Sequence, residues 1–341
     1  MIGMLEVIVT SSVQVVVVIV AVLTGCAWST WLERKVLGRM QHRIGPSYTG
    51  PYGLLQPMAD GLKLIFKEDI VPDNVERLTY TLAPMISFVP ALLTFAVIPF
   101  SREFSIFGVE FRGVISDLNI GILWVFAVTS LGVYGLILAG WSSGSKYSLL
   151  GGIRASAQMI SYEVSYGLSI VGVILVAGTL SMTELVAKQA SDSVWFFENW
   201  YVWRNPLGYL IYIVCAIAET NRAPFDLPEA ESELVAGYHT EYSSMRFAMF
   251  FIGEYANMLA VACVATTLFF GGWNGPAFLS FVPPVIWFLI KVFVFMFCYI
   301  WLRATFPRFR YDQLMRFGWL VLLPLAIFNA MVTGLFVLWL G

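Results

Sequence analysis

Long apolar runs separated by shorter polar segments dominate the pattern along the chain. A helix needs about 20 apolar residues to cross roughly 30 Å of hydrocarbon. Backbone polar groups in lipid must be satisfied within the segment, and the short alternating strands of a membrane β-barrel are absent from the pattern. It therefore predicts an all-α integral membrane protein, a single polytopic membrane domain over 1–341. We expect spans near 7–31, 79–100, 118–140, 154–180, 206–222, 244–270, 281–304 and 316–340.

Composition agrees with this fold class. The chain is 59% hydrophobic and only 12% charged, about half the charged fraction of a soluble domain. Residues 1–31 carry Glu6, lack a basic leader and form too long an apolar run for a signal peptide. The net charge of −2 indicates no partner, and without a basic face on a soluble domain we expect no nucleic acid partner.

Lysine and arginine predict the orientation in the membrane. Arg102, Arg112, Lys188 and Arg204 lie on one side, and Lys291 lies within a span. The other 15 of the 20 cations (20 − 4 − 1) lie in or beside the loops 32–78, 141–153, 223–243 and 305–315. Cytoplasmic loops carry the excess of positive charge. We therefore expect these loops in the cytoplasm and both termini on the opposite, outer side of the membrane.

Cysteine and histidine usage argues against several kinds of site. Each cysteine falls in a different predicted span and none forms a C-x-x-C pair, which argues against zinc or an iron–sulfur cluster. They are Cys26, Cys215, Cys263 and Cys298. The two histidines lie in predicted loops, so a bis-histidine haem within the membrane is excluded. GWSSGSKYS at 140–148 misses the register of a phosphate loop. The chemistry left to this chain involves protons, apolar ligands or partner proteins.

The first predicted loop contains an amphipathic segment, GLLQPMADGLKLIF at 53–66. At 100° per residue its apolar side chains cover one face and its polar ones the other, as in an interfacial helix. Pro57 suits a first helical turn. Two interpretations stay open: a helix that floats on the lipid surface, or one that frames an opening through which a lipid-soluble ligand enters.

Ionisable residues inside the predicted spans are the strongest functional signal. They are costly in hydrocarbon and mark ion pathways or buried pairs. The candidates are Glu163, Glu219, Glu254 and Lys291. One lysine can fully neutralise only one glutamate, so a purely structural Glu–Lys pair leaves at least two acids unexplained. We expect a proton path.

The fourth predicted span carries a polar stripe. Arg154, Gln158, Ser161 and Ser165 share one helix face, while Glu163 lies about 180° from Arg154. Glu163 must therefore interact with another helix, and Lys291, Glu219 and Glu254 are its candidate partners. The stripe itself could also be ordinary hydrogen bonding between helices.

A dense acidic stretch, APFDLPEAESELVAG at 223–237, follows the fifth predicted span. Asp226 and Glu229 have the spacing of a capping box, which could start a short helix through Gly237. That leaves Glu231 and Glu233 unexplained, and Glu229 would repel Glu233 on a helix. Closely spaced carboxylates share protons and titrate as a group. We interpret the stretch as a proton-accepting funnel that leads to Glu219.

Several stretches together resemble one known family. AETNRAPFDLPEAESELVAG at 218–237 is similar to the signature loop of the H subunit of bacterial NADH–quinone oxidoreductase, respiratory complex I, and of its mitochondrially encoded counterpart. The first loop departs from the family, with Gly45-Pro46-Ser47 where Gly-Pro-Asn is usual. Further matches are WLERKVLGRM (31–40), GPYGLLQPMADGLKLIFKE (50–68), IRASAQMISYEV (153–164), GEYANM (253–258) and RATFPRFRYDQLM (303–315).

The resemblance implies a subunit that helps to enclose the quinone-reduction chamber where the membrane and peripheral arms meet. The implied chamber residues are Arg34, Asp60, Arg222, Phe225 and Asp226. The implied proton path runs from Glu229, Glu231 and Glu233 through Glu219, Glu163 and Glu254, supported by Tyr162, Arg154 and Lys291.

The resemblance also implies what the chain works with. Quinone is the substrate, and NADH, FMN and iron–sulfur clusters belong to partner subunits. This chain then binds no cofactor or metal and holds no complete active site. Its partners are the other membrane-arm subunits, the peripheral-arm subunits of the quinone site, and the lipid bilayer.

Three alternatives use many of the same residues. An equivalent subunit of a membrane-bound hydrogenase or related dehydrogenase complex would share the motifs. A stand-alone proton-coupled transporter would use the same buried acids, but it would more often show inverted repeats, which this sequence lacks. A purely structural anchor for a peripheral arm leaves the buried acids without a purpose.

Overall fold

The computed structural model describes residues 2–106, 109–191, 197–226, 236–276, 279 and 281–340. Within these ranges seven helices are long and apolar enough to cross a membrane, and α8 (Pro206–Glu219) is a shorter apolar helix. The prediction of an all-α membrane protein with about eight spans is confirmed. The seven are α1 (Ile2–Met40), α3 (Arg77–Leu93), α4 (Gly121–Ser142), α5 (Lys146–Ala177), α10 (Ser244–Phe269), α11 (Pro284–Thr305) and a last helix formed by α12 (Tyr311–Arg316), the π-helical turn η5 (Phe317–Leu322) and α13 (Leu323–Leu340).

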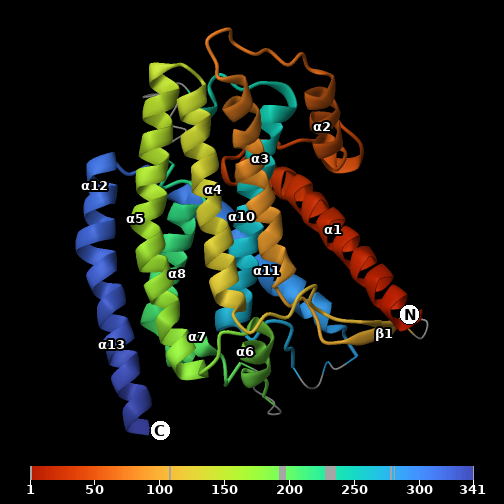
Figure 1. Cartoon of the computed structure of the whole chain (residues 1–341), viewed down its shortest axis with the longest axis vertical. Helices are drawn as coiled ribbons and strands as arrows, with labels where there is room; N and C mark the ends of the chain where they lie inside the picture. Colours follow the sequence, from red (N-terminus) through yellow and green to blue (C-terminus); the bar gives the residue numbers. More distant parts are fainter. Residues whose placement is uncertain are drawn as a thin grey trace.

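The helices form a bundle with two outlying members (Figure 1). α3, α4 and α5 lie side by side in chain order, and α8 and α10 pack behind them. α13 packs along the outer side of α5, while α1 crosses the opposite edge obliquely and contacts α10 and α11. Both termini lie at the lower end in Figure 1, and α2 lies at the upper end.

Short elements complete the two ends. The amphipathic segment of the first loop forms α2 (Gln56–Phe66), as predicted. The apolar side chains of α2, including Met58 and Phe66, remain exposed, as expected for a helix on a lipid surface. The other short elements are η1 (Pro51–Gly53), η2 (Thr94–Ala96), α6 (Met182–Lys188), α7 (Tyr201–Arg204) and η3 (Gly237–His239).

One element was not predicted. β1 (Phe104–Ile106) pairs antiparallel with β2 (Val109–Phe111) in the connection between α3 and α4. The backbone beside it is also paired, because Phe100 N–H donates to the carbonyl of Gly113 at 2.8 Å. We refer to residues 100–114 as the hairpin segment. The hairpin is too short to change the fold class.

Helix ends differ from the predicted spans where polar residues continue a helix or proline stops it. α1 continues to Met40 although the apolar run ends near 31, and α5 begins at Lys146 rather than 154. α3 and η2 end before the predicted limit of 100. Pro99 explains this early end, because the residue before a proline is disfavoured in the helical region.

Small residues let the central helices approach closely. A Cβ atom on Gly135 of α4 would lie 2.7 Å from the backbone nitrogen of Ser87 on α3. One on Gly140 would lie 3.1 Å from the Cα of Gly152 on α5. In lipid, such close backbone packing drives helix association, because no hydrophobic force acts between apolar helices.

Candidate functional site

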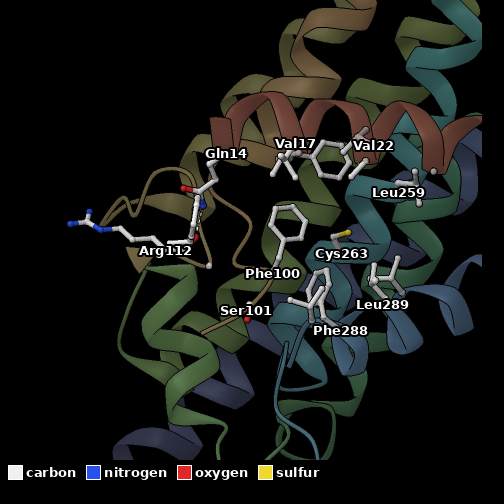
Figure 2. Close-up of a pocket in the computed structure, with 18 of the residues that line it drawn as sticks. Gln14, Val17, Val22, Phe100, Ser101, Arg112, Leu259, Cys263, Phe288 and Leu289 are labelled. Carbon is white, nitrogen blue, oxygen red and sulfur yellow. Dashed lines mark hydrogen bonds between the residues drawn. The ribbon is translucent and has the colours of Figure 1, made fainter. Parts of the chain in front are cut away.

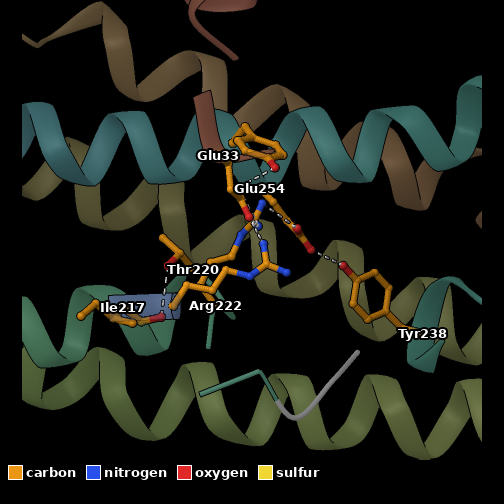
Figure 3. A network of polar contacts seen from close by, with 8 residues as sticks. Glu33, Ile217, Thr220, Arg222, Tyr238 and Glu254 are labelled. Carbon is orange, nitrogen blue, oxygen red and sulfur yellow. Dashed lines mark hydrogen bonds and ion pairs between the residues drawn. The ribbon is translucent and has the colours of Figure 1, made fainter. Parts of the chain in front are cut away.

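A cluster of charged side chains joins three spans to the loop after α8 (Figure 3). Glu33 of α1 is only 5% exposed. Arg222 Nη1 lies 3.3 Å from its Oε1, Arg303 of α11 binds the same oxygen, and Tyr255 of α10 donates its hydroxyl to Oε2 at 2.7 Å. A buried carboxylate is tolerable only with such partners. Glu33 therefore ties α1, α10 and α11 to this loop.

Glu254 extends the cluster on the other side of Arg222. Arg222 Nη2 lies 3.8 Å from Glu254 Oε2, and Tyr238 donates its hydroxyl to Glu254 Oε1 at 3.0 Å. The guanidinium also lies 4.4 Å from the centre of the Tyr255 ring, as a cation–π contact. With two arginines and two glutamates, the cluster is balanced in charge.

Arg222 retains unused hydrogen-bonding capacity. Its Nε and Nη2 atoms are buried and have no hydrogen-bond acceptor among the described residues. A guanidinium presents five N–H donors and stays protonated in proteins. The contacts among the described residues therefore leave donors of Arg222 without a hydrogen bond, although Nη2 is within ion-pair distance of Glu254.

The loop at 220–226 is held from two sides. Gln158 of α5 donates from Nε2 to the carbonyls of Ala218 and Phe225, at 2.9 and 2.8 Å. The Phe225 ring packs at 5.6 Å from Tyr162 and at 5.4 Å from Phe309. Two of the chamber residues that the resemblance implies in this loop, Phe225 and Asp226, are buried, and the loop is held against α5.

A strap, which we define as residues 303–316, holds the same loop from the other side. Arg308 Nη2 lies 2.9 Å from Oδ2 of the buried Asp226, and Phe309 N–H donates to the carbonyl of Pro224 at 3.1 Å. Tyr162 donates its hydroxyl to the carbonyl of Leu314 at 2.8 Å. The strap thus connects the loop with α5.

The two remaining predicted chamber residues meet each other. Arg34 Nη1 lies 2.7 Å from Asp60 Oδ2, and Gln56 donates to the other Asp60 oxygen at 3.0 Å. Arg34 follows Glu33 in α1, and Asp60 belongs to the polar face of α2. The pair therefore attaches the amphipathic helix to the helix that carries the buried carboxylate.

Two predicted proton-path glutamates lie near one another deeper in the bundle. Glu163 accepts a hydrogen bond from Ser130 of α4 and interacts electrostatically with Glu219. Glu219 Oε2 is buried and has no hydrogen-bond partner among the described residues. Beside it, Tyr166 donates to Tyr212 at 3.0 Å, and Tyr212 donates to the carbonyl of Val261. Among the described residues, the polar groups around Glu219 therefore include the Glu163 carboxylate and the hydroxyls of Tyr166 and Tyr212.

Lys291 does not join the glutamates. Its Nζ donates to the carbonyls of Phe270, Gly272 and Asn274 at 2.7 to 2.8 Å and lies 5.0 Å from the centre of the Trp200 ring. Among the described residues it forms no ion pair. Lys291 binds the turn that follows α10, at the end of the bundle opposite Glu33.

Of the other predicted residues, Arg154 lies over the ring of Tyr311 at 5.8 Å, next to the strap. Glu229, Glu231 and Glu233 fall at 227–235, outside the described residues, as does most of the short helix expected there. In the polar stripe of α5, Gln158 and Ser161 both form hydrogen bonds. Ser161 accepts one from Trp319 Nε1 at 3.1 Å.

Sequence reasoning missed Glu33, Arg303, Arg308, Tyr238 and Tyr255 as site residues. Glu33 lies two residues beyond the predicted end of the first span, so it was counted as a loop residue. Arg303 and Arg308 stand in RATFPRFRYDQLM without an assigned role. An acid directly after a long apolar run, with arginines at the end of another, is the signal that could have identified them.

Comparisons with known proteins agree with this site. The sequence matches the family described as NADH dehydrogenase over residues 13–334. It is 54% identical to an NADH-quinone oxidoreductase H subunit of Koribacter versatilis, the one numbered 2, over 95% of this chain and 96% of that protein. It is 53% identical to the NADH-quinone oxidoreductase H subunit of Thermomicrobium roseum, over 94% of each chain. The chain therefore belongs to the NADH dehydrogenase family that includes the H subunits of NADH-quinone oxidoreductases.

Proposed function

We propose that this chain is a membrane subunit of a proton-translocating NADH–quinone oxidoreductase. It forms part of the quinone-reduction chamber and couples quinone reduction to proton translocation. The single observation that carries the proposal is the buried Glu33–Arg222–Glu254 cluster, because it connects a membrane-surface loop with three spans. The relatives named as H subunits of this enzyme support the same assignment.

The proposed chamber lies at the end of the bundle near α2. Arg34, Asp60, Arg222, Phe225 and Asp226 form its wall on this chain, and α2 frames the opening to the lipid. The exposed apolar face of α2 supports this role, since a quinone arrives through the bilayer. The free donors of Arg222 are suited to a carbonyl oxygen of the quinone or to a carboxylate of the acidic loop.

Coupling follows from proton and charge balance. Reduction of a quinone to a quinol takes two electrons and two protons. The electrons come from an iron–sulfur cluster in a partner subunit. NADH donates them to this cluster through FMN in another partner subunit. Protons taken by the quinone leave Glu229, Glu231 and Glu233 more negative. Because Arg222 is shared with Glu33 and Glu254, this change in charge alters the field at Glu254 and then at Glu219 and Glu163.

The residues named as supports take different parts in this proposal. Tyr162 positions Phe225 and the strap, and Arg154 holds Tyr311 of the strap. Lys291 is not part of the path, because its donors are used by three backbone carbonyls. The partners are membrane-arm and peripheral-arm subunits, in a bacterial inner membrane with both termini on the periplasmic side.

The first test is a mild-detergent purification of the tagged chain from its native membrane, with an assay of NADH-driven quinone reduction. We expect a large assembly with iron–sulfur absorbance and inhibitor-sensitive activity. Copurification with hydrogenase chains would change the electron donor and overturn the assignment to an NADH-driven enzyme. A lone chain with proton-coupled flux would overturn the whole proposal.

The second test addresses coupling. In Glu219→Gln and Glu163→Gln, an isosteric amide cannot take or release the proton. We expect the assembled enzyme to lose proton pumping and most of its coupled quinone reduction. Glu184→Gln is the control, because Glu184 is an exposed acid of α6 paired with Lys188. Full coupled activity in both glutamine variants would rule out the proposed path.

A further inference from the structure

A cavity of about 500 Å³ lies between α1, α10, α11 and the hairpin segment (Figure 2). Its volume falls within the range of about 300–1,000 Å³ that holds ligands in other proteins. Val17, Val22, Leu259, Phe288 and Leu289 are among its lining residues. Its walls are almost wholly apolar, so the cavity suits an apolar chain.

The cavity is distinct from the charged cluster. Gln14 marks its outer end on α1, and Glu33 lies 19 positions further along the same helix (33 − 14). At 1.5 Å per residue this separation is roughly 28 Å, about the thickness of the hydrocarbon core. The two sites therefore lie toward opposite ends of α1. A second cavity of about 480 Å³ shares Gly25 and Leu259 with the first and continues toward Trp31.

At the end of the cavity near Gln14, the backbone of the hairpin segment is bound to α1. Gln14 donates from Nε2 to the carbonyls of Arg112 and, at 3.1 Å, of Val114. This fixes the hairpin segment against α1 and consumes the amide donors, so Gln14 presents an apolar stem to the cavity. A Cβ atom on Gly113 would lie 1.7 Å from the Ser101 carbonyl oxygen, which shows how tightly this closure is built.

A charge stands at the rim. Arg112 contributes to the lining, yet its side chain is exposed and extends away from the apolar interior (Figure 2). Gln14, Ser101 and Arg112 are the polar members of the wall apart from the Cys263 thiol. Gln14 and Arg112 lie together at this end, where the Gln14 amide binds the Arg112 carbonyl (Figure 2). The site thus combines a long apolar interior with a single cation at one end, which matches an amphiphile with an anionic head.

We propose that this cavity binds one acyl chain of an anionic phospholipid from the leaflet at the N-terminal end of α1, with its phosphate beside Arg112. Charge complementarity at the rim favours a phospholipid over a quinone, whose uncharged head belongs near Glu33. The bound lipid fills the gap that the oblique course of α1 leaves beside α11. It thereby supports the hairpin segment and holds α1 in place.

The test uses the intact complex in phosphatidylcholine vesicles with a trace of phosphatidylglycerol that carries a photoreactive diazirine on its acyl chain. Labelled peptides are identified by mass spectrometry. We expect labelling on α1 between 13 and 25 and on α11 between 285 and 292. The decisive variant is Val17→Phe, which fills the cavity. Its control is Val16→Phe, because both valines are 60% exposed and only Val17 lines the cavity.

We expect Val17→Phe to lower the labelling about tenfold, while Val16→Phe leaves it unchanged. Arg112→Gln is expected to lower phosphatidylglycerol labelling about fivefold, as for the loss of one cation beside an anionic lipid. It should leave labelling by a phosphatidylcholine probe with the same chains unchanged. Arg102→Gln is the control, since Arg102 is exposed but does not line the cavity.

Three results would overturn the proposal. Equal labelling of the two valine variants would mean ordinary contact with surrounding lipid. Loss of labelling when excess quinone is added would assign the cavity to a quinone tail. Absence of labelling in the complex, with cross-links to another subunit instead, would assign it to a partner helix.

Discussion

Arg303 of α11 and Glu33 of α1 form an ion pair although 270 positions separate them in the chain. Tyr255 and Arg222 bind the same carboxylate. A single buried acid therefore connects the first span, the sixth, the seventh and the loop after α8. This makes Glu33 the residue on which the relative positions of these four segments depend.

Replacement of Glu33 by alanine is expected to prevent stable assembly of the complex. Removing one partner of a buried ion pair costs about 3–5 kcal/mol, because the remaining charges lose their compensation. Glu33→Gln keeps an oxygen for the Tyr255 hydroxyl, so we expect assembly with quinone reduction lowered about tenfold. The amount of assembled complex and its quinone-reductase rate report both effects. Wild-type activity in Glu33→Ala would contradict this role, and the exposed Glu103 provides the control variant Glu103→Gln.

The Arg308–Asp226 pair is expected to set the apparent affinity for quinone. We expect Arg308→Gln and Asp226→Asn each to raise the KM for quinone, because both release the loop that carries Phe225. In a double-mutant cycle on kcat/KM, their coupling energy should reach about 1–3 kcal/mol. Arg310→Gln is the matched control, since Arg310 is 79% exposed and pairs with an exposed Asp312. Strict additivity of the two changes would show that the pair does not position the loop.

Gly135→Ala is expected to destabilise the bundle by about 1–3 kcal/mol, as overpacking does. Its new methyl group would meet the backbone of Ser87 at 2.7 Å. Gly132→Ala, one turn earlier on α4, meets nothing within 4 Å and should be neutral or slightly stabilising. Thermal unfolding of the two variants measures the difference. Equal midpoints would mean that α3 and α4 can separate at no cost.

Lys291→Met is expected to lower stability without uncoupling the enzyme. The change leaves three backbone carbonyls without their donor, and each buried unsatisfied group costs about 1–3 kcal/mol. The proton-to-electron ratio of the surviving complex should remain that of the wild type. Lys188→Met is the control, since it removes an exposed pair with Glu184 and one bond to the Ala177 carbonyl, against three carbonyls for Lys291. A stable but uncoupled Lys291→Met enzyme would return this lysine to the proton path.

Most of the fold could be predicted from the sequence because the signals for membrane helices are local. Apolar length predicted the spans, and the amphipathic pattern predicted α2. The boundaries were less predictable, since the polar extension of α1 to Met40 looks like a loop when it is read by hydrophobicity. The hairpin segment has no strong local pattern, and its attachment to α1 depends on Gln14, about 100 positions away.

The site could be predicted only as a set of residue types. Residues at 218–226 were recognisable as functional, and Arg34 and Asp60 were both named. That these two pair with each other, and that Glu33 compensates Arg222, are long-range contacts that no local pattern encodes. The sequence suggested Lys291 as a counter-ion of a buried glutamate because only its charge is visible there. The backbone carbonyls that it binds are visible only in the fold.

The short length of α8 has a consequence for the backbone that follows it. At 1.5 Å per residue, its 14 residues rise about 21 Å, roughly 9 Å less than the hydrocarbon core is thick. Irregular backbone at such a depth is tolerated only inside protein or beside an aqueous space. The loop at 220–226 occupies this depth inside the protein, because α5 and the strap hold its backbone and side chains. The Glu219 Oε2 atom, on the last residue of α8, is thereby enclosed by protein.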